Sequence, residues 1–277
     1  MPARSPPRGL AALLGALATA TAGVPRGRRL LGLVALLGLP VLIVCLRVLL
    51  GGDGRGEGFL NFARVVTYAY AQLVLPLALI SMGTGAFGDE WASGTSHYLA
   101  GLPVPRWSLV LGRWLAVVRR ALMFVLPAIV LVYLLSLASF DEALTHYLPA
   151  LGWVLIVISL LTAAYSAIFI FFGLALRRAV MTGLVYAFVI ETATSKLPQA
   201  FARSSLAFHG SNLLWQITEQ DAFKPMTRDV FEVEPVSVVG SLAWMGIITA
   251  LALALATLAL RRKESGSDTT ARDAAET

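Results

Sequence analysis

Few side chains in this sequence could take part in chemistry. One acid, Glu191, lies in an otherwise apolar stretch, and a charge at the centre of a bilayer costs about 2.5–3.5 kcal/mol on insertion scales. Such a carboxylate can be protonated, paired with Arg47 or Arg64, or exposed to an aqueous cavity, and it can also cap the loop that follows it. We therefore treat Glu191 as a possible intramembrane polar site, with a structural role and a role on a substrate route as the alternatives.

The sequence patterns of common catalytic and metal sites are missing. None of the three lysines, Lys196, Lys224 and Lys263, follows the glycine-rich loop that binds nucleotide phosphates. The three histidines are far apart in the sequence, and Cys45 is the only cysteine, so zinc-binding spacing is absent. The stretch 83–88 matches the dinucleotide pattern GxGxxG, but it follows an apolar run rather than a strand, so helix packing explains these glycines better. We predict no catalytic residue, no metal site and no cofactor bound by this chain.

The connection over residues 88–106 has the pattern of a short helix between two apolar segments. Asp89 and Glu90 suit a helix N-terminus, where carboxylates meet unpaired amide groups. A glycine followed by Pro103 is typical of a helix stop. We expect a short helix over 93–102, held at the membrane surface.

Basic and aromatic residues recur regularly in the next segment. Arg106, Arg113 and Arg120 are spaced by seven residues, and so are Trp107 and Trp114. On a helix, a spacing of seven places each set along one stripe. Arginine beside tryptophan is typical of the lipid headgroup boundary, so we expect this segment to run along or through that interface before it enters the membrane.

Composition indicates that these segments belong to a membrane protein. Of the 277 residues, 57% are hydrophobic and only 14% are charged, whereas soluble domains carry about 25% charged residues. That leaves too little polar surface to cover a water-soluble globule. The net charge of +6 does not indicate nucleic-acid binding, because the basic residues separate apolar runs instead of forming one patch.

Six apolar stretches are long enough to cross the hydrocarbon layer as helices, which takes about 20 residues. They are residues 30–50, 65–87, 121–138, 148–176, 179–195 and 236–260. The runs are continuous and lack the alternating pattern of a membrane β-barrel. We predict an all-α, polytopic integral membrane protein whose six transmembrane helices form one domain over residues 30–260.

The distribution of positive charge predicts the orientation. Of the 22 basic residues, 15 lie before the first span, after the second, after the fourth or after the last. Because basic residues concentrate on the cytoplasmic side, we expect both termini and the loop 88–106 to be cytoplasmic. The long loop 196–235 is then extracellular, with short helices on or in the outer leaflet, and 261–277 is a disordered cytoplasmic tail.

The segment 1–29 precedes the first span and contains a weaker apolar stretch at residues 9–24. This stretch is either a cleaved signal peptide or an interfacial helix. Arginines directly after it would oppose translocation, so we favour the interfacial helix.

The loop between the second and third spans resembles that of a known transporter family. Its acidic pair, its Ser-Gly-Thr, its short helix and its Leu-Pro-Val-x-Arg are similar to the loop of type-2 ABC transporter permeases, the ABC-2 family. The matching positions are Asp89, Glu90, Ser93, Gly94, Thr95, Leu102, Pro103, Val104 and Arg106. The stretch from Gly183 to Glu191 also resembles the second half of that family.

The resemblance implies the membrane-spanning subunit of an ABC exporter in a prokaryotic cell membrane. In that family the loop docks on a separate ATPase, which binds ATP and Mg, so the matching positions are expected to couple the two subunits. Asp89, Glu90 and Arg106 are expected to transmit the movement. A second copy of the chain, or a related permease, is expected to complete the path, and membrane lipid is the other expected partner.

Other function classes remain open at this point. A secondary transporter would need no ATPase, but it is expected to carry inverted repeats and several intramembrane ionisable groups. We find no convincing repeat and one candidate acid, Glu191. A membrane-bound enzyme or a structural membrane protein is a further alternative. Nothing in the apolar segments indicates the substrate.

Overall fold

The computed structural model describes residues 28–49, 58–92, 105–139, 144–193, 203–225 and 236–275, and these residues form helices and no strand. The α-helices are α2 (Arg28–Leu49), α3 (Gly58–Arg64), α4 (Leu75–Ala92), α6 (Arg106–Ser139), α7 (Leu148–Ala175), α8 (Ala179–Val185), α10 (Leu206–Thr218) and α12 (Val238–Ala275). Two π-helices, η1 (Val65–Val74) and η2 (Tyr186–Ala193), and the short 3-10 helix η4 (Asp221–Phe223) complete the described part. The all-α fold class is therefore confirmed for these residues.

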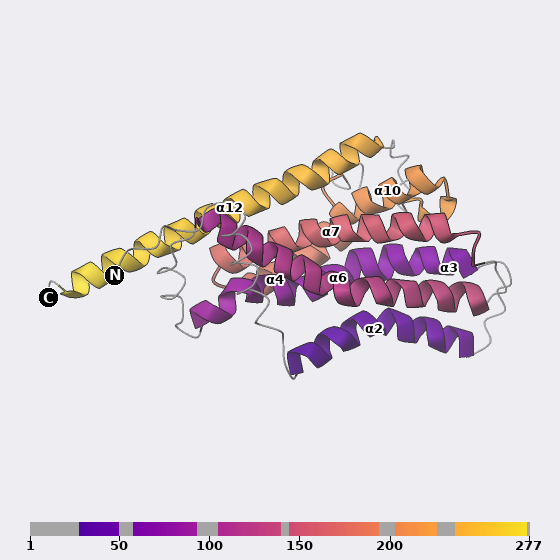
Figure 1. The fold of residues 1–277 in the computed structure, drawn as a ribbon, viewed down its shortest axis with the longest axis horizontal. Coiled ribbons are helices and arrows are strands. Elements are labelled where there is room, and N and C mark those ends of the chain that lie inside the picture. The colour runs from indigo at the N-terminus through magenta and orange to yellow at the C-terminus, as the bar shows by residue number, and fades with distance from the viewer. Residues whose placement is uncertain are drawn as a thin grey trace, which may run out of the picture.

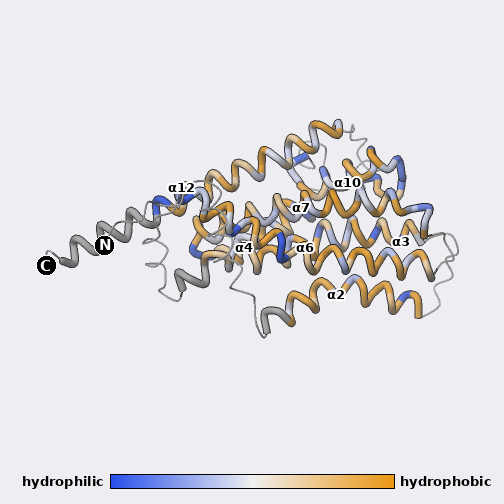
Figure 2. Tube along the Cα trace, in the orientation of Figure 1, coloured by the Kyte–Doolittle hydropathy of each residue, from blue (hydrophilic) through white to orange (hydrophobic). Residues whose placement is uncertain are grey.

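The long helices lie side by side in an up-and-down bundle (Figure 1). Helix α7 is central, since it packs against α4, α6, α8, α10 and α12. Five helices are long and apolar enough to cross a membrane: Leu31–Leu49, Gly58–Phe87, Arg106–Ala138, Leu148–Ala175 and Val238–Arg262. Figure 2 shows the apolar residues running along all of them. The chain is thus a multi-pass membrane protein.

The helices at the edges of the bundle expose large apolar side chains. On α2, Leu42 is 66% exposed, and on α12 Ile247 is 60% exposed. By contrast, Tyr165 and Phe169 of the central α7 are fully buried. Apolar faces of this size suit contact with lipid rather than water.

The fourth predicted span agrees with the structure to within one residue. Helix α7 covers 148–175, where the sequence predicts 148–176. Pro149 lies in its first turn, where the missing amide hydrogen costs nothing, and the polar turn Arg177–Arg178 follows its end.

The second span begins earlier than predicted, at Gly58 instead of residue 65. The polar side chain of Asn61 is buried in this extension, where it accepts a hydrogen bond from Arg47 and donates one to Ser136 at 3.2 Å. A buried amide is tolerated when its hydrogen bonds are satisfied, so Asn61 does not end the helix.

The π-helix η1 lies within this second helix, directly before its proline. The amide of Leu75 bonds to the carbonyl of Tyr70, five residues earlier, and Pro76 follows. Proline has no amide hydrogen to donate, and the wider helical turn accommodates the change of register.

The third span also begins earlier than predicted. The sequence analysis places it at 121–138, whereas α6 is one continuous helix of 34 residues from Arg106 to Ser139. The arginine-bearing segment and the membrane segment are therefore a single helix.

The fifth predicted span, 179–195, is shorter than a full crossing. It consists of α8 and η2, and its apolar part, Ala179–Glu191, falls below the length of the other spans. In the described part of the chain, five helices are therefore long enough for a membrane crossing, and Ala179–Glu191 forms a shorter apolar helix.

Two further helical segments lie where the sequence predicts a loop and a tail. Helix α10 lies in the predicted loop 196–235, and its residues 206–214 are all buried against neighbouring helices. Helix α12 continues to Ala275, where the sequence predicts a disordered tail at 261–277. The segment 9–24 and the loop 93–104 lie outside the described residues.

Candidate functional site

The first candidate site lies where α4 ends and α6 begins. Helix α7 ends at the same end of the bundle (Figure 1), which we call the arginine end, because α6 begins with Arg106 and the turn Arg177–Arg178 follows α7. Pro105 directly precedes α6, and its carbonyl oxygen accepts hydrogen bonds from the amide and the hydroxyl of Ser108, at 3.0 and 2.7 Å. These bonds fix the chain's entry into α6.

The structure places three of the predicted coupling residues at this corner. Asp89 and Glu90 belong to the last turn of α4, which ends at Ala92, so they do not open a new helix as the sequence analysis predicts. The apolar second span simply continues through them. Arg106 is the first residue of α6 and is half-buried. The others, Ser93, Gly94, Thr95, Leu102, Pro103 and Val104, lie outside the described residues.

A buried arginine joins the two helices at this corner. Arg113 of α6 is only 6% exposed, and its guanidinium donates a hydrogen bond to the carbonyl of Ala86 on α4. The same guanidinium lies 4.3 Å from the centre of the Phe87 ring, a favourable cation–π contact. Arg113 therefore attaches α6 to α4 two residues before Asp89.

Helix α4 is held equally closely on its other side. A Cβ atom at Gly173 of α7 would come within 2.8 Å of the Thr84 carbonyl oxygen, and one at Gly83 within 2.7 Å of Phe169 Cβ. Only glycine permits this separation of the two backbones. The prediction that the 83–88 glycines serve helix packing is confirmed for Gly83.

Helix α6 is also tied to α7. The indole nitrogen of Trp114 donates a hydrogen bond of 2.9 Å to the carbonyl of Ala163. Together, the contacts of Trp114, Arg113 and the two glycines join α4, α6 and α7 into one packed unit.

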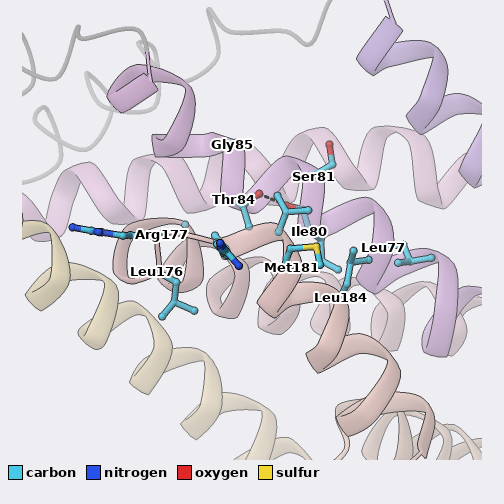
Figure 3. Close-up of a pocket in the computed structure, with 13 residues that line it drawn as sticks. Leu77, Ile80, Ser81, Thr84, Gly85, Leu176, Arg177, Met181 and Leu184 are labelled. Atoms are coloured by element: carbon cyan, nitrogen blue, oxygen red, sulfur yellow. Dashed lines mark hydrogen bonds between the residues drawn. The ribbon is translucent and has the colours of Figure 1, made fainter.

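A cavity of about 640 Å³ opens at the arginine end, between α4, the end of α7 and α8 (Figure 3). Its apolar residues include Leu77, Ile80 and Leu184, and its polar residues include Arg177 and Arg178. No sequence pattern indicated this cavity, because it is formed by three segments that are far apart in the chain.

The second candidate site is the carboxylate of Glu191, which is fully buried. Its Oε1 accepts hydrogen bonds from the Tyr186 hydroxyl at 3.0 Å and the Leu206 amide at 3.2 Å. Its Oε2 accepts from the Ser205 hydroxyl at 2.8 Å and the Ala207 amide at 3.0 Å. The carboxylate thus caps the N-terminus of α10, where unpaired amides and the helix dipole favour a negative charge.

Of the sequence-based alternatives for Glu191, these contacts correspond to the capping of the segment that follows it. Arg47 bonds to Asn61. The buried hydroxyl of Tyr165 also lies within interaction range of this carboxylate. Glu191 therefore lies in a polar pocket inside an apolar bundle.

A second polar network joins α10 to α12. Asn212 donates a hydrogen bond to the Ser241 hydroxyl at 3.0 Å, and that hydroxyl lies 3.3 Å from Nδ1 of His209. Nε2 of His209 lies 2.8 Å from the carbonyl of Arg203, so this nitrogen carries the proton and Nδ1 accepts. Burial lowers the pKa of His209 below its ordinary value of 6.5, and the Arg203 charge acts in the same direction.

Sequence reasoning missed several of these residues. The seven-residue repeat pointed to Arg113, but as part of an interfacial stripe instead of a buried contact. Ser205 carried no signal, and Tyr186 belonged only to the stretch 183–191 that resembles the ABC-2 family, because the role of both side chains depends on where Glu191 lies. The described side chains include no group of three histidine, cysteine, aspartate or glutamate residues placed to hold a metal ion.

The comparison with known proteins agrees with this architecture. A sequence model of the family described as ABC-2 family transporter protein matches residues 28–194, more than half of the chain. No curated protein matches the sequence. The matched region runs from the start of α2 to the end of η2, and it contains both the corner held by Arg113 and Glu191. The chain therefore belongs to the ABC-2 family of membrane transport proteins.

Proposed function

We propose that this chain is the permease subunit of an ABC exporter, driven by a separate ATPase that docks on the loop between α4 and α6. The family match over residues 28–194 carries this proposal. The ATPase binds ATP and Mg, a second copy or a related permease completes the path, and this chain makes and breaks no covalent bond.

The packing at the arginine end supports a mechanical role for the loop. A push on residues 93–102 reaches the last turn of α4 and the first turn of α6 together, because the loop joins them directly. Arg113, seven residues into α6, holds that helix to Ala86, six residues before α4 ends, and Gly83 and Gly173 pass the displacement of α4 on to α7. Closely packed interfaces respond to such a push by changing between discrete arrangements.

The two π-helices lie where the packed unit of α4, α6 and α7 could move relative to the rest of the bundle. Helix η1 separates the closely held α4 from α3, whose Asn61 is bound to α2 and α6. Helix η2 follows α8 and contacts η1. Since π-helical turns are irregular and often lie at functional sites, we propose that η1 and η2 bend when the loop is pushed.

Labelling from each side of the membrane tests the orientation on which this proposal rests. Thr95→Cys and Asp53→Cys, each in a Cys45→Ser background, are exposed to an impermeant maleimide in intact cells and in inverted vesicles. Thr95→Cys is expected to react only in inverted vesicles and Asp53→Cys only in intact cells. Reaction of Thr95→Cys in intact cells would place the loop away from any cytoplasmic ATPase and exclude the proposal.

Co-purification tests the partner. The chain, expressed with its chromosomal neighbours, is expected to retain a P-loop ATPase on purification, and Glu90→Arg is expected to release it. An exposed substitution on the same end, Arg262→Glu, serves as the control and is expected to retain it. Transport without any associated ATPase would favour the secondary-transporter alternative.

A further inference from the structure

The cavity at the arginine end has a polar end and an apolar end. Figure 3 shows Arg177 at one end and Leu77, Met181 and Leu184 gathered at the other. Ser81 lines the cavity as well and offers a hydroxyl donor. The volume of about 640 Å³ lies within the roughly 300–1,000 Å³ of sites that bind small molecules.

The polar end carries positive charge from the described residues that line it. The cavity lining contains two arginines and no acidic residue. Both arginines are exposed, and no hydrogen bond or ion pair links either guanidinium to another side chain among the described residues. Guanidinium groups bind phosphate through paired, charge-assisted hydrogen bonds, so the polar end is complementary to a phosphate-bearing anion.

The apolar end is complementary to a hydrocarbon chain. Along α4 the lining extends from Leu77 to Gly85, nine residues that rise by about 12 Å along the helix. The neighbouring helix α8 presents Val180 and Met181, which are 50% and 63% exposed. A ligand with its charge at the membrane surface and its apolar part directed into the membrane matches this order of residues.

We propose that the cavity binds an anionic phospholipid of the leaflet at the arginine end, with its phosphate between Arg177 and Arg178 and part of an acyl chain against Leu77, Ile80 and Leu184. Basic pockets between membrane helices are suited to lipid headgroups. The proposal concerns this chain alone and does not require an ATPase partner. Its failure would leave the proposed function untouched.

Lipid binding by the purified full-length chain tests the proposal. Native mass spectrometry of the detergent-solubilised protein compares added phosphatidylglycerol with phosphatidylcholine of identical chains, and glycerol 3-phosphate serves as the soluble headgroup. Phosphatidylglycerol is expected to bind most tightly. The double variant Arg177→Gln/Arg178→Gln is expected to weaken its binding roughly twenty- to thirty-fold, since each arginine near the surface contributes about fivefold.

Matched variants separate the cavity from general effects. Met181→Trp, which fills the cavity from an exposed position, is expected to reduce phosphatidylglycerol binding, while Val185→Trp, exposed on the same helix but outside the lining, is not. Arg261→Gln/Arg262→Gln removes the same charge from α12 and is expected to have no effect.

Four outcomes would overturn the proposal. They are equal binding of the two phospholipids, binding of phosphatidylglycerol that survives loss of Arg177 and Arg178, equally tight binding of glycerol 3-phosphate, and occupation of the cavity by a second copy. The last is detected as a disulfide between two Met181→Cys chains in a Cys45→Ser background that excludes the lipid.

Discussion

The guanidinium of Arg113 lies against the Phe87 ring, 4.3 Å from its centre, and bonds to the carbonyl of the preceding residue, Ala86. One side chain from α6 thus binds both a carbonyl and an aromatic ring on α4. It does so just before the acidic pair Asp89 and Glu90, at the point where the chain leaves the bundle.

Replacement of Arg113 tests this contact. Arg113→Gln is expected to lower stability by about 1–3 kcal/mol, because a charged hydrogen bond and a cation–π contact are lost together. Thermal unfolding in detergent measures the loss. Arg119→Gln, exposed on the same helix, is the control and should change stability by less than about 0.5 kcal/mol. Equal effects of the two variants would contradict the special role of Arg113.

The close approach of α4 and α7 predicts that adding one methyl group at Gly173 lowers stability. In Gly173→Ala the new Cβ meets the Thr84 backbone at 2.8–2.9 Å, and backbone atoms cannot move aside as a flexible side chain can. The expected cost is about 1–3 kcal/mol, measured by thermal unfolding. Gly152→Ala, on the same helix but with nothing within 4 Å, should be neutral or slightly stabilising. A Gly173→Ala variant as stable as the parent would show that the helices separate freely.

The hydrogen bonds of Glu191 predict that even the isosteric substitution Glu191→Gln lowers stability. Each oxygen accepts one side-chain hydroxyl and one backbone amide, so the NH₂ group of Glu191→Gln must face a backbone N–H in either orientation. Leaving that donor unpaired should cost about 1–3 kcal/mol. Hydrogen exchange at the start of α10 is expected to increase.

Replacement of the capping serine, Ser205, is expected to lower stability by a smaller amount than replacement of Glu191. Ser205 donates to Glu191 and accepts from the Phe208 amide at 3.2 Å, so Ser205→Ala should cost about 1 kcal/mol. Its exposed neighbour, Ser204→Ala, should cost nothing measurable. If Glu191→Gln folds normally and transports at the parental rate, Glu191 has no role on a substrate route.

The buried imidazole of His209 predicts a stability that falls in acid. Because its pKa is lowered by burial, the folded chain binds fewer protons than the unfolded chain, whose imidazole titrates near 6.5. Stability should therefore be constant above about pH 7 and decline as the pH falls through 6.5. Melting temperatures between pH 7.5 and 5 measure this. His209→Gln should flatten the decline, whereas His146→Gln, at an exposed site, should not.

The sequence predicted the helices best where local signals and tertiary packing agree. Helix α7 matches the predicted apolar stretch 148–176 to within one residue, because a proline in its first turn and the polar Arg177–Arg178 turn bound that stretch. The start of the second helix was wrong because Asn61 looks polar in sequence, while in the structure Arg47 and Ser136 satisfy its amide. Hydropathy cannot register a partner that lies 75 residues away.

The candidate sites were predictable only in part. Glu191 was identified as an isolated acid, but its partners at 205–207 lie across a loop without a periodic pattern. Arg113 belonged to a repeat that suits a lipid-facing stripe equally well. Its burial depends on Ala86 and Phe87 of another helix. Whether an arginine faces lipid or protein is decided by which helix packs against it.

Helices η2 and α10 meet at the carboxylate of Glu191. These two segments can move apart more easily than two halves of one continuous helix. Four hydrogen bonds join Glu191 to Tyr186 and to residues 205–207, and three of the four cross from η2 to the start of α10. Parting the two segments requires breaking those three bonds, whereas bending a continuous helix by the same amount would disrupt its backbone ladder. Helix η2 and the start of α10 are therefore two separate pieces that the carboxylate of Glu191 joins.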